Sequence, residues 1–287
     1  MTLDHYSPSS VGMFDRCPRA WHYRYIEGIK TPPAAAMIVG SSVHTAQARH
    51  FGDILDGAGG LEVDEYIAAA ADDYERRAAD VDWAREDATS GSHKDRATSM
   101  AKAHRQIIVP TVVDVRAVEH EIRLSPAAID GLADALRLET PICGPALVCI
   151  LDVVDRPVGV TRVRDLKTRG KAPSGVTAYR KRGDPAALEV DTAHIIQLAA
   201  YTLASWAASR AKPLTAVDYV WTGKSGDAVS VPVALADADL RLFLEDLRAM
   251  DRQVRAGLFP RRRNGWHCSD RACGYWDRCI GSVGTDL

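Results

Sequence analysis

The segment from Ala117 to Lys167 constrains the fold of this chain most strongly. Residues 117–124, 147–155 and 158–167 are rich in β-branched and partly alternating apolar side chains, and Pro157 and Gly159 interrupt the last two runs. Such runs are typical of strands, and the short break predicts a β-hairpin. Helix-periodic sequence lies on both sides of the segment, so we expect an α/β fold built around a sheet.

Helices are expected before and after these strands. Ser7 and Pro8 provide a capping hydroxyl and a first-turn proline, and Cys17-Pro18 restarts the helix. Helical patterns also cover a segment that opens at Gly40 and residues 64–79, 92–108, 191–210 and 237–257, whereas 217–221 and 228–233 resemble short strands. We expect one domain over 1–287, with a helical region over 1–116, a core over 117–257 and a cysteine-rich tail over 258–287.

The composition excludes several classes of protein. Its hydrophobic fraction of 46% and charged fraction of 26% are ordinary for a globular chain and argue against disordered, collagen-like and membrane proteins. The net charge of −2 means that nucleic-acid binding would depend on local basic patches. Residues 1–16 do not resemble a signal peptide, so we expect a cytoplasmic protein whose six cysteines stay reduced or bind metal.

Asp165 and Lys167 lie two residues apart on a predicted strand, so both side chains leave the same face of the sheet. Asp152 lies on the preceding strand, where cross-strand pairing can bring its carboxylate within reach of Asp165. Two carboxylates suit Mg²⁺ or Mn²⁺, which can polarise a phosphate and lower the pKa of bound water. Lys167 could then position or deprotonate that water. The simpler alternative is an ordinary surface ion pair between Asp165 and Lys167.

An ordered series of motifs surrounds this pair. It consists of Gly40-x-x-x-His44, Glu119 with Glu121, Asp152, Asp165-x-Lys167 and Gln197-x-x-x-Tyr201. The series resembles the PD-(D/E)XK nucleases of the RecB-like exonuclease family. That resemblance implies a restriction-endonuclease-like mixed sheet flanked by helices, with a helical N-terminal insertion.

The resemblance also implies roles for individual side chains. His44, Asp152 and Asp165 would bind the metal, and Lys167 would be the catalytic lysine. Without the resemblance, a lone histidine such as His44 is more often a structural residue than a ligand. The chain departs from the family pattern at Cys149, where a glycine is usual, and in a longer segment between residues 124 and 147.

Three further polar residues belong to the same expected site. Gln197 and Tyr201 are four residues apart on one helix face, which would turn towards the active site and DNA. Glu119 would match an additional acid found in many members of the family. Glu121 projects from the same predicted strand face, so the sequence does not choose between the two acids.

Four cysteines are candidate metal ligands: Cys17, Cys268, Cys273 and Cys279. The last three form a short C-terminal run, and Cys17 resembles the first cysteine of the Cas-four and AddB group. The resemblance implies that the four thiolates hold a [4Fe–4S] cluster in a C-terminal iron–sulfur lobe. The C-x4-C-x5-C spacing differs from the more common C-x2-C start, and a zinc site, with His267 as a competing ligand, remains the alternative. Cys143 and Cys149 are expected to be buried free thiols.

The implied activity is exonucleolytic cleavage of DNA at single-stranded ends, with duplex ends as the open alternative, in recombination, repair or CRISPR spacer acquisition. A helicase, recombination proteins or CRISPR adaptation proteins would be the partners, because the chain lacks a Walker A motif of its own. Candidate DNA contacts are the basic runs 167–171, 180–182 and 261–263 and the aromatic residues Trp21, Tyr23, Trp266 and Trp276. The alternatives are a non-catalytic DNA-binding or scaffold protein with this fold and a zinc-stabilised nuclease.

Overall fold

The computed structural model describes residues 3–138, 144–183, 188–222 and 226–281. The chain divides into two compact units. The first unit consists of Met1–Pro32, Arg123–Val148 and Asp237–Leu287, and the second of Pro33–Ile122 and Cys149–Ala236. Both ends of the chain therefore belong to the first unit.

A six-stranded mixed sheet has the strand order β1-β3-β4-β5-β6, and β2 pairs with β3. The strands are β1 (His5–Tyr6), β2 (Ala117–Leu124), β3 (Ala146–Asp155), β4 (Arg162–Arg169), β5 (Leu214–Trp221) and β6 (Asp227–Val233). β3 and β4 form an antiparallel pair, β4 and β5 are parallel, and β5 and β6 are antiparallel. The expected α/β fold with a mixed sheet flanked by helices is confirmed, as is the hairpin between β3 and β4.

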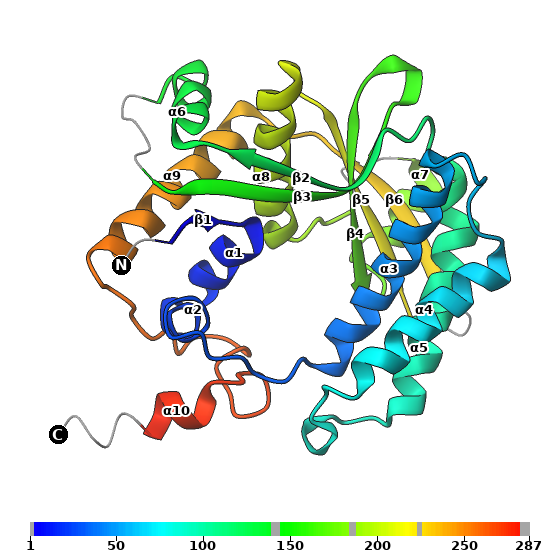
Figure 1. Ribbon diagram of the computed structural model, residues 1–287, viewed down its shortest axis with the longest axis horizontal. Coiled ribbons are helices and arrows are strands. Elements are labelled where there is room, and N and C mark those ends of the chain that lie inside the picture. Colours follow the sequence, from blue (N-terminus) through cyan, green and yellow to red (C-terminus); the bar gives the residue numbers. More distant parts are fainter. Residues whose placement is uncertain (1–2, 139–143, 184–187, 223–225, 282–287) are drawn as a thin grey trace. The chain divides into compact units, whose positions relative to one another are not determined.

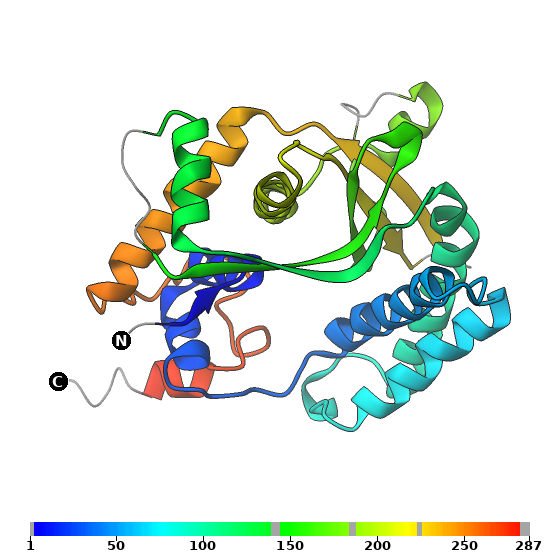
Figure 2. The same cartoon turned by 45° about the horizontal axis from the view of Figure 1, so that its top comes forward.

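Helices cover both faces of β4–β6 in the second unit. They are α3 (Ala35–Leu55), α4 (Val63–Ala78), α5 (Ser90–Ala103), α7 (Val176–Arg182) and α8 (Thr192–Ser209). Figures 1 and 2 show α3, α4 and α5 on one side of these strands and α8 on the other. Leu166 of β4 and Val220 of β5 share an apolar core with Val39 and Val43 of α3. Because strand side chains alternate, Asp165 and Lys167 project from the opposite face, which α8 covers.

The first unit holds α1 (Pro8–Arg16), α2 (Pro18–Tyr25), α6 (Pro126–Ala135), α9 (Asp237–Arg255) and α10 (Trp276–Gly281). Ser7 caps α1 through a reciprocal capping box with Ser10, which satisfies two backbone donors at the start of the helix. Trp21 of α2 is 0% exposed, and its ring stacks on Phe259 at 5.9 Å between centroids. The Tyr275 hydroxyl donates to the Ile29 carbonyl at 3.0 Å. The N-terminal helices and the C-terminal tail thus share one core.

Several predicted boundaries were wrong for identifiable reasons. α3 begins at Ala35 instead of Gly40, and it needs no side-chain cap because Glu86 accepts a hydrogen bond from the Ala35 amide at 2.8 Å. The helix expected over 92–108 ends at Ala103 and widens into a π-helical turn over His104–Ile108. β4 begins at Arg162, not at residue 158, since Val158 and Gly159 have φ values of 46° and 80° and form a turn.

Four short elements were not expected: β1, α6, α7 and α10. Each has 10 residues or fewer, which is too short for a clear periodic signal. α6 occupies the segment that had been noted only as longer than usual for the family. Within the described residues, no helix is long and apolar enough to cross a membrane.

Candidate active site

The β3–β4 hairpin brings Asp152, Asp165 and Lys167 together, as the sequence predicted. The register pairs Val153 with Arg164, and the Leu166 amide donates to Asp152 Oδ2 at 2.8 Å. Lys167 Nζ donates to Asp165 Oδ1 at 2.8 Å and lies 2.7 Å from Oδ2 in an ion pair. Asp165 is 0% exposed and Asp152 is 7% exposed. The ion pair between Asp165 and Lys167 is therefore not the surface ion pair considered above. Asp165 Oδ2 is a buried oxygen without a hydrogen bond.

His44 reaches this carboxylate pair from α3. The close approach of α3 to β4 requires a glycine one turn earlier, because a Cβ at Gly40 would lie only 2.8 Å from Thr168 Oγ1. His44 Nε2 lies 3.1 Å from the Leu166 carbonyl oxygen, and Nδ1 lies 3.5 Å from Asp152 Oδ2. If Nε2 carries the proton and donates to Leu166, Nδ1 is left with a lone pair on the carboxylate side. Burial lowers the pKa of His44, which favours this neutral ring.

Glu119 of β2 completes a group of ligand atoms. Atoms of His44, Glu119 and Asp152 all lie within 4.8 Å of one another. Glu119 has a φ of 46°, a left-handed backbone that is uncommon for a residue other than glycine and interrupts the regular strand. Glu121 does not belong to this group within the described part of the chain. Alternation alone could not separate the two acids, because the backbone departs from regular β geometry at one of them.

The site accumulates negative charge in a buried setting. Burial, opposed by Lys167, raises the pKa of Asp152 to about 6. Burial, opposed by Lys167 and assisted by the Asp152 carboxylate, raises the pKa of Asp165 to about 6. Although much of Glu119 is exposed, desolvation and then Asp152 raise the pKa of its carboxyl group as well. Three carboxylates face one lysine, so a cation would relieve their repulsion. Oxygen donors with one imidazole suit a divalent ion such as Mg²⁺ or Mn²⁺.

Gln197 and Tyr201 lie on the face of α8 that is turned towards β4. Gln197 Nε2 donates to the Tyr201 hydroxyl at 2.5 Å, as their spacing of four residues allows. Burial, and then the charges of Asp165 and Asp152, raise the pKa of Tyr201. The charges of these two carboxylates therefore act on this hydroxyl. The structure thus places every residue of the expected catalytic set in one region of the second unit.

Two further side chains lie beside Lys167 that the sequence analysis did not single out. His194 is three residues before Gln197 on α8, and Tyr219 is the register partner of Lys167 on β5. His194 Nδ1 and the Tyr219 hydroxyl are 2.9 Å apart. The helical spacing of three residues from Gln197 was a usable signal for His194, whereas Tyr219 required the strand register.

The four candidate cluster cysteines all belong to the first unit. Cys17 joins α1 to α2, Cys279 lies in α10, and Cys268 and Cys273 lie in the tail before it. Burial and then the charges of Cys17, Cys279 and Cys268 raise the pKa of the Cys273 thiol. No three of them, however, have sulfurs within 4.8 Å of one another. A single tetrahedral zinc ion would need sulfurs about 3.8 Å apart.

The two remaining cysteines have separate outcomes. Cys149 is a buried free thiol, as expected, and its sulfur lies 3.7 Å from the Ala200 carbonyl oxygen of α8. Burial raises the pKa of this thiol to about 12, so it packs as a small apolar group. Cys143 lies outside the described residues.

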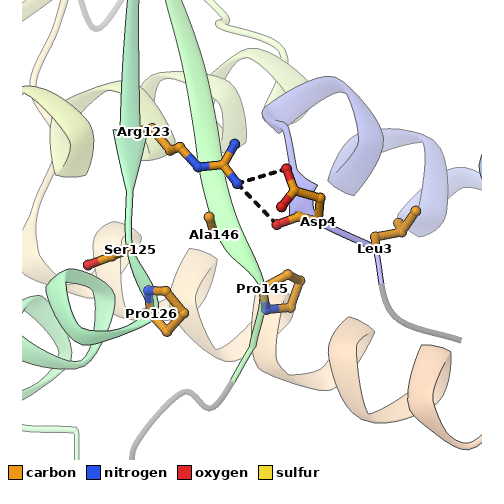
Figure 3. Close-up of a pocket in the computed structure, with 7 residues that line it drawn as sticks. All are labelled: Leu3, Asp4, Arg123, Ser125, Pro126, Pro145 and Ala146. Carbon is orange, nitrogen blue, oxygen red and sulfur yellow. Dashed lines mark hydrogen bonds and ion pairs between the residues drawn. The ribbon is translucent and has the colours of Figure 1, made fainter.

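A pocket in the first unit, shown in Figure 3, is lined by Leu3, Asp4, Arg123, Ser125, Pro126, Pro145 and Ala146. Arg123 Nη2 donates to Asp4 Oδ2 at 2.8 Å, so the two charges of the pocket neutralise each other. The other lining residues are small or apolar and supply no nucleophile or metal-ligand set. The chemistry therefore lies with the acids of the second unit and not with this pocket.

Comparisons with known proteins agree with this geometry. A model of the PD-(D/E)XK nuclease superfamily matches residues 5–280. A crystal structure from Eubacterium rectale, described as that of a "putative exonuclease", is similar in fold, with a TM-score of 0.52 and 14% sequence identity over 94% of this chain and 87% of that chain. The likeness supports a restriction-endonuclease-like fold. No curated protein matches the chain.

Proposed function

Because the chain belongs to the PD-(D/E)XK nuclease superfamily, we propose that it is a Mg²⁺- or Mn²⁺-dependent DNA exonuclease of the RecB-like, Cas-four-like kind. The observation that carries this proposal is the group of His44, Glu119 and Asp152 ligand atoms beside the buried Asp165–Lys167 pair. A scaffold protein would have no need for this arrangement, since burying the Asp152 and Asp165 carboxylates beside Glu119 without a cation is unfavourable. Recombination, repair or CRISPR spacer acquisition would use such an activity.

Each side chain has a proposed role in the cleavage of a phosphodiester bond. His44, Asp152 and Asp165 would hold the cation, with Glu119 as an additional acid. A bound divalent ion would polarise the scissile phosphate and lower the pKa of the attacking water. Lys167 would position that water or accept its proton. Gln197 and Tyr201 orient the substrate from α8.

The four thiols of the first unit support a [4Fe–4S] cluster better than zinc. The other three thiols raise the pKa of Cys273, but the four sulfurs are spread more widely than ligands of a single ion. A cluster of four irons occupies a larger volume between its ligands than one zinc ion does. The cluster would join α1, α2 and the C-terminal tail, whose packing is already fixed by contacts such as the Arg278–Glu27 ion pair at 2.6 Å.

Single-stranded DNA is the proposed substrate, and one exposed aromatic residue supports this choice. Trp21 and Tyr23 are buried, whereas Trp266 is 78% exposed next to the basic run 261–263. An exposed indole beside arginines suits a stacked, unpaired base and its phosphate. In the run 180–182, Arg180 pairs with Asp227 at 2.7 Å and covers the Trp221 ring, so this arginine already has protein partners.

The exonuclease proposal can be tested by product analysis. Purified protein with Mn²⁺ is incubated with single-stranded and duplex oligonucleotides that carry a label at the 5′ or the 3′ end, and products are resolved over time. Exonucleolytic cleavage releases short products from one end first and leaves circular single strands intact. Equal cutting of circular and linear strands would show an endonuclease and would refute this part of the proposal.

Replacing His44 with alanine is expected to lower cleavage at limiting Mn²⁺ by about ten- to a hundredfold, because metal affinity falls when one ligand is lost. Asp152, Asp165 and Lys167 remain in place, so high Mn²⁺ should restore much of the rate. The measurement is the rate of cleavage as a function of Mn²⁺ concentration. His120, an exposed histidine, provides the control variant His120→Ala. An unchanged Mn²⁺ dependence in His44→Ala would reduce His44 to a structural residue.

The buried acids also predict how pH affects metal-free protein. Burial raises the pKa of Asp152 and Asp165 from 3.8 to about 6, so between these values the folded protein binds more protons than the unfolded chain. Their contribution to stability therefore falls as pH rises through this window and stays low above it. At about pH 8 with EDTA, Asp165→Asn should melt a few degrees above the wild type. Thermal unfolding should show that the melting temperatures of the variant and the wild type converge near pH 4. A variant that melts below the wild type at about pH 8 would contradict this account.

A further inference from the structure

His194 and Tyr219 form a hydrogen-bonded chain that fixes which ring nitrogen carries the proton. Burial raises the pKa of Tyr219, and a backbone hydrogen bond from Asp191, which opposes this rise, places an amide donor on the phenol oxygen. The hydroxyl proton is then available for His194 Nδ1, which lies 2.9 Å from that oxygen. Since Nδ1 accepts this bond, the proton of the neutral ring resides on Nε2.

Nε2 is the end of the ring without a protein partner. Among the described residues, no hydrogen bond to His194 Nε2 is formed, and this atom is not one of the fully buried polar atoms. Burial, and then the charges of Lys167 and Arg169, lower the pKa of His194 to about 4. The ring is therefore a neutral N–H donor at physiological pH, with its donor end accessible.

The surroundings of His194 continue the proposed catalytic row. Asp165, Lys167 and Arg169 alternate along one face of β4, and α8 covers this face with His194, Gln197 and Tyr201, spaced three and four residues apart. The charge of Asp165 raises the pKa of Tyr201, whereas the charges of Lys167 and Arg169 lower the pKa of His194. His194 thus faces the positive charges of the row, with the Asp191 carboxylate as an opposing charge that raises its pKa. The guanidinium of Arg169 covers the Tyr219 ring at 5.5 Å.

We propose that His194 Nε2–H donates a hydrogen bond to a non-bridging oxygen of the substrate phosphate adjacent to the scissile one, and that Tyr219 is a positioning residue that holds the ring in this tautomer. The inference rests on the proposed DNA-cleaving function and adds a phosphate subsite to it. A neutral donor between two cationic side chains suits an anionic acceptor, and phosphate oxygens receive most protein contacts in nucleic-acid complexes. A cationic ligand would be repelled by Lys167 and Arg169.

The expected effect falls on KM more than on kcat, because the bond exists in both the bound substrate and the transition state. His194→Ala should raise KM about tenfold or more with kcat within about threefold of wild type. His194→Gln keeps an N–H donor and should recover part of this loss. Tyr219→Phe removes tautomer control and should raise KM less than His194→Ala does. Tyr179→Phe, which removes a hydroxyl bonded to the Ser230 carbonyl, is the matched control with unchanged KM.

The deciding experiment replaces single phosphates of a labelled oligonucleotide with uncharged methylphosphonates and measures kcat/KM of the wild type and His194→Ala with Mn²⁺. We expect one linkage next to the cleaved one at which the replacement costs the wild type about tenfold and costs the variant almost nothing. If every replacement costs both proteins the same factor, His194 only supports Tyr219 and the subsite is refuted. If the wild type cleaves no substrate with Mn²⁺, the proposed function fails together with this inference.

Discussion

Replacing Lys167 with methionine is expected to lower kcat for DNA cleavage by about a thousandfold, the range in which a positioned proton-transfer group contributes to catalysis. Lys167 Nζ donates to Oδ1 of the buried Asp165 carboxylate and is ion-paired with Oδ2, so it is held where the attacking water must be steered. Methionine keeps the length and apolar stem of the side chain but removes its charge and its donors. The fold should persist, as seen by circular dichroism and a cooperative thermal transition.

The control for this variant is Lys102→Met. Lys102 is an exposed lysine of α5 that belongs to none of the basic runs considered as DNA contacts, so losing its charge should change the rate by less than a few-fold. Equal activity of Lys167→Met and the wild type would mean that the active site has been misplaced. Equal losses in both variants would instead indicate that the lysines act only through general attraction to DNA.

Replacing Cys17 with serine is expected to remove the iron–sulfur cluster and to destabilise the first unit. Protein purified without oxygen should be brown and contain about four irons per chain, and the variant should lose colour and iron together. Cys17 lies at the junction of α1 and α2, far in sequence from the three tail cysteines. A cluster bound to all four closes a loop of most of the chain, so losing it should lower the melting temperature as well.

Cys149→Ala provides the matched control, since Cys149 is a buried free thiol of the second unit. It should retain full iron content even if its packing defect costs some stability. Retention of iron by Cys17→Ser combined with its loss from Cys149→Ala would overturn the ligand assignment. Colourless protein containing one zinc per chain would identify the zinc-stabilised alternative.

The sequence was sufficient for those parts of the site that depend on regular geometry. Asp165 and Lys167 share a strand face because of the two-residue period, and Gln197 bonds to Tyr201 because of the four-residue helical spacing. The hairpin placed Asp152 correctly because the turn between β3 and β4 is short. These relations depend on local geometry, so they can be predicted without knowledge of the tertiary structure.

Other features depended on contacts between distant segments. The choice of Glu119 over Glu121 follows from a left-handed residue within β2, which no propensity predicts for a glutamate. The partnership of His194 with Tyr219 needs the packing of α8 on β5. The need for Gly40 became clear only from its closeness to Thr168, a residue 128 positions further along the chain.

A buried ion-pair network of the second unit was also absent from the sequence analysis. Arg164 forms a bidentate pair with Asp218 at 2.8 Å, and Arg162 pairs with Asp155. In the sequence these residues resemble the polar positions of half-exposed strands. Their burial on the α3–α5 face of the sheet depends on the helices that cover it, and this information is not contained in strand periodicity.

The central claim is that the buried acids bind a divalent cation that enables DNA cleavage. Its most direct test compares EDTA-treated wild type and Asp165→Asn on labelled single-stranded DNA, before and after Mn²⁺ is added in excess of EDTA. We predict no cleavage by either protein without metal, rapid cleavage by the wild type with Mn²⁺, and a loss of at least about a thousandfold in the variant. Metal-independent cleavage by the wild type, or equal Mn²⁺-dependent rates for the two proteins, would contradict the account.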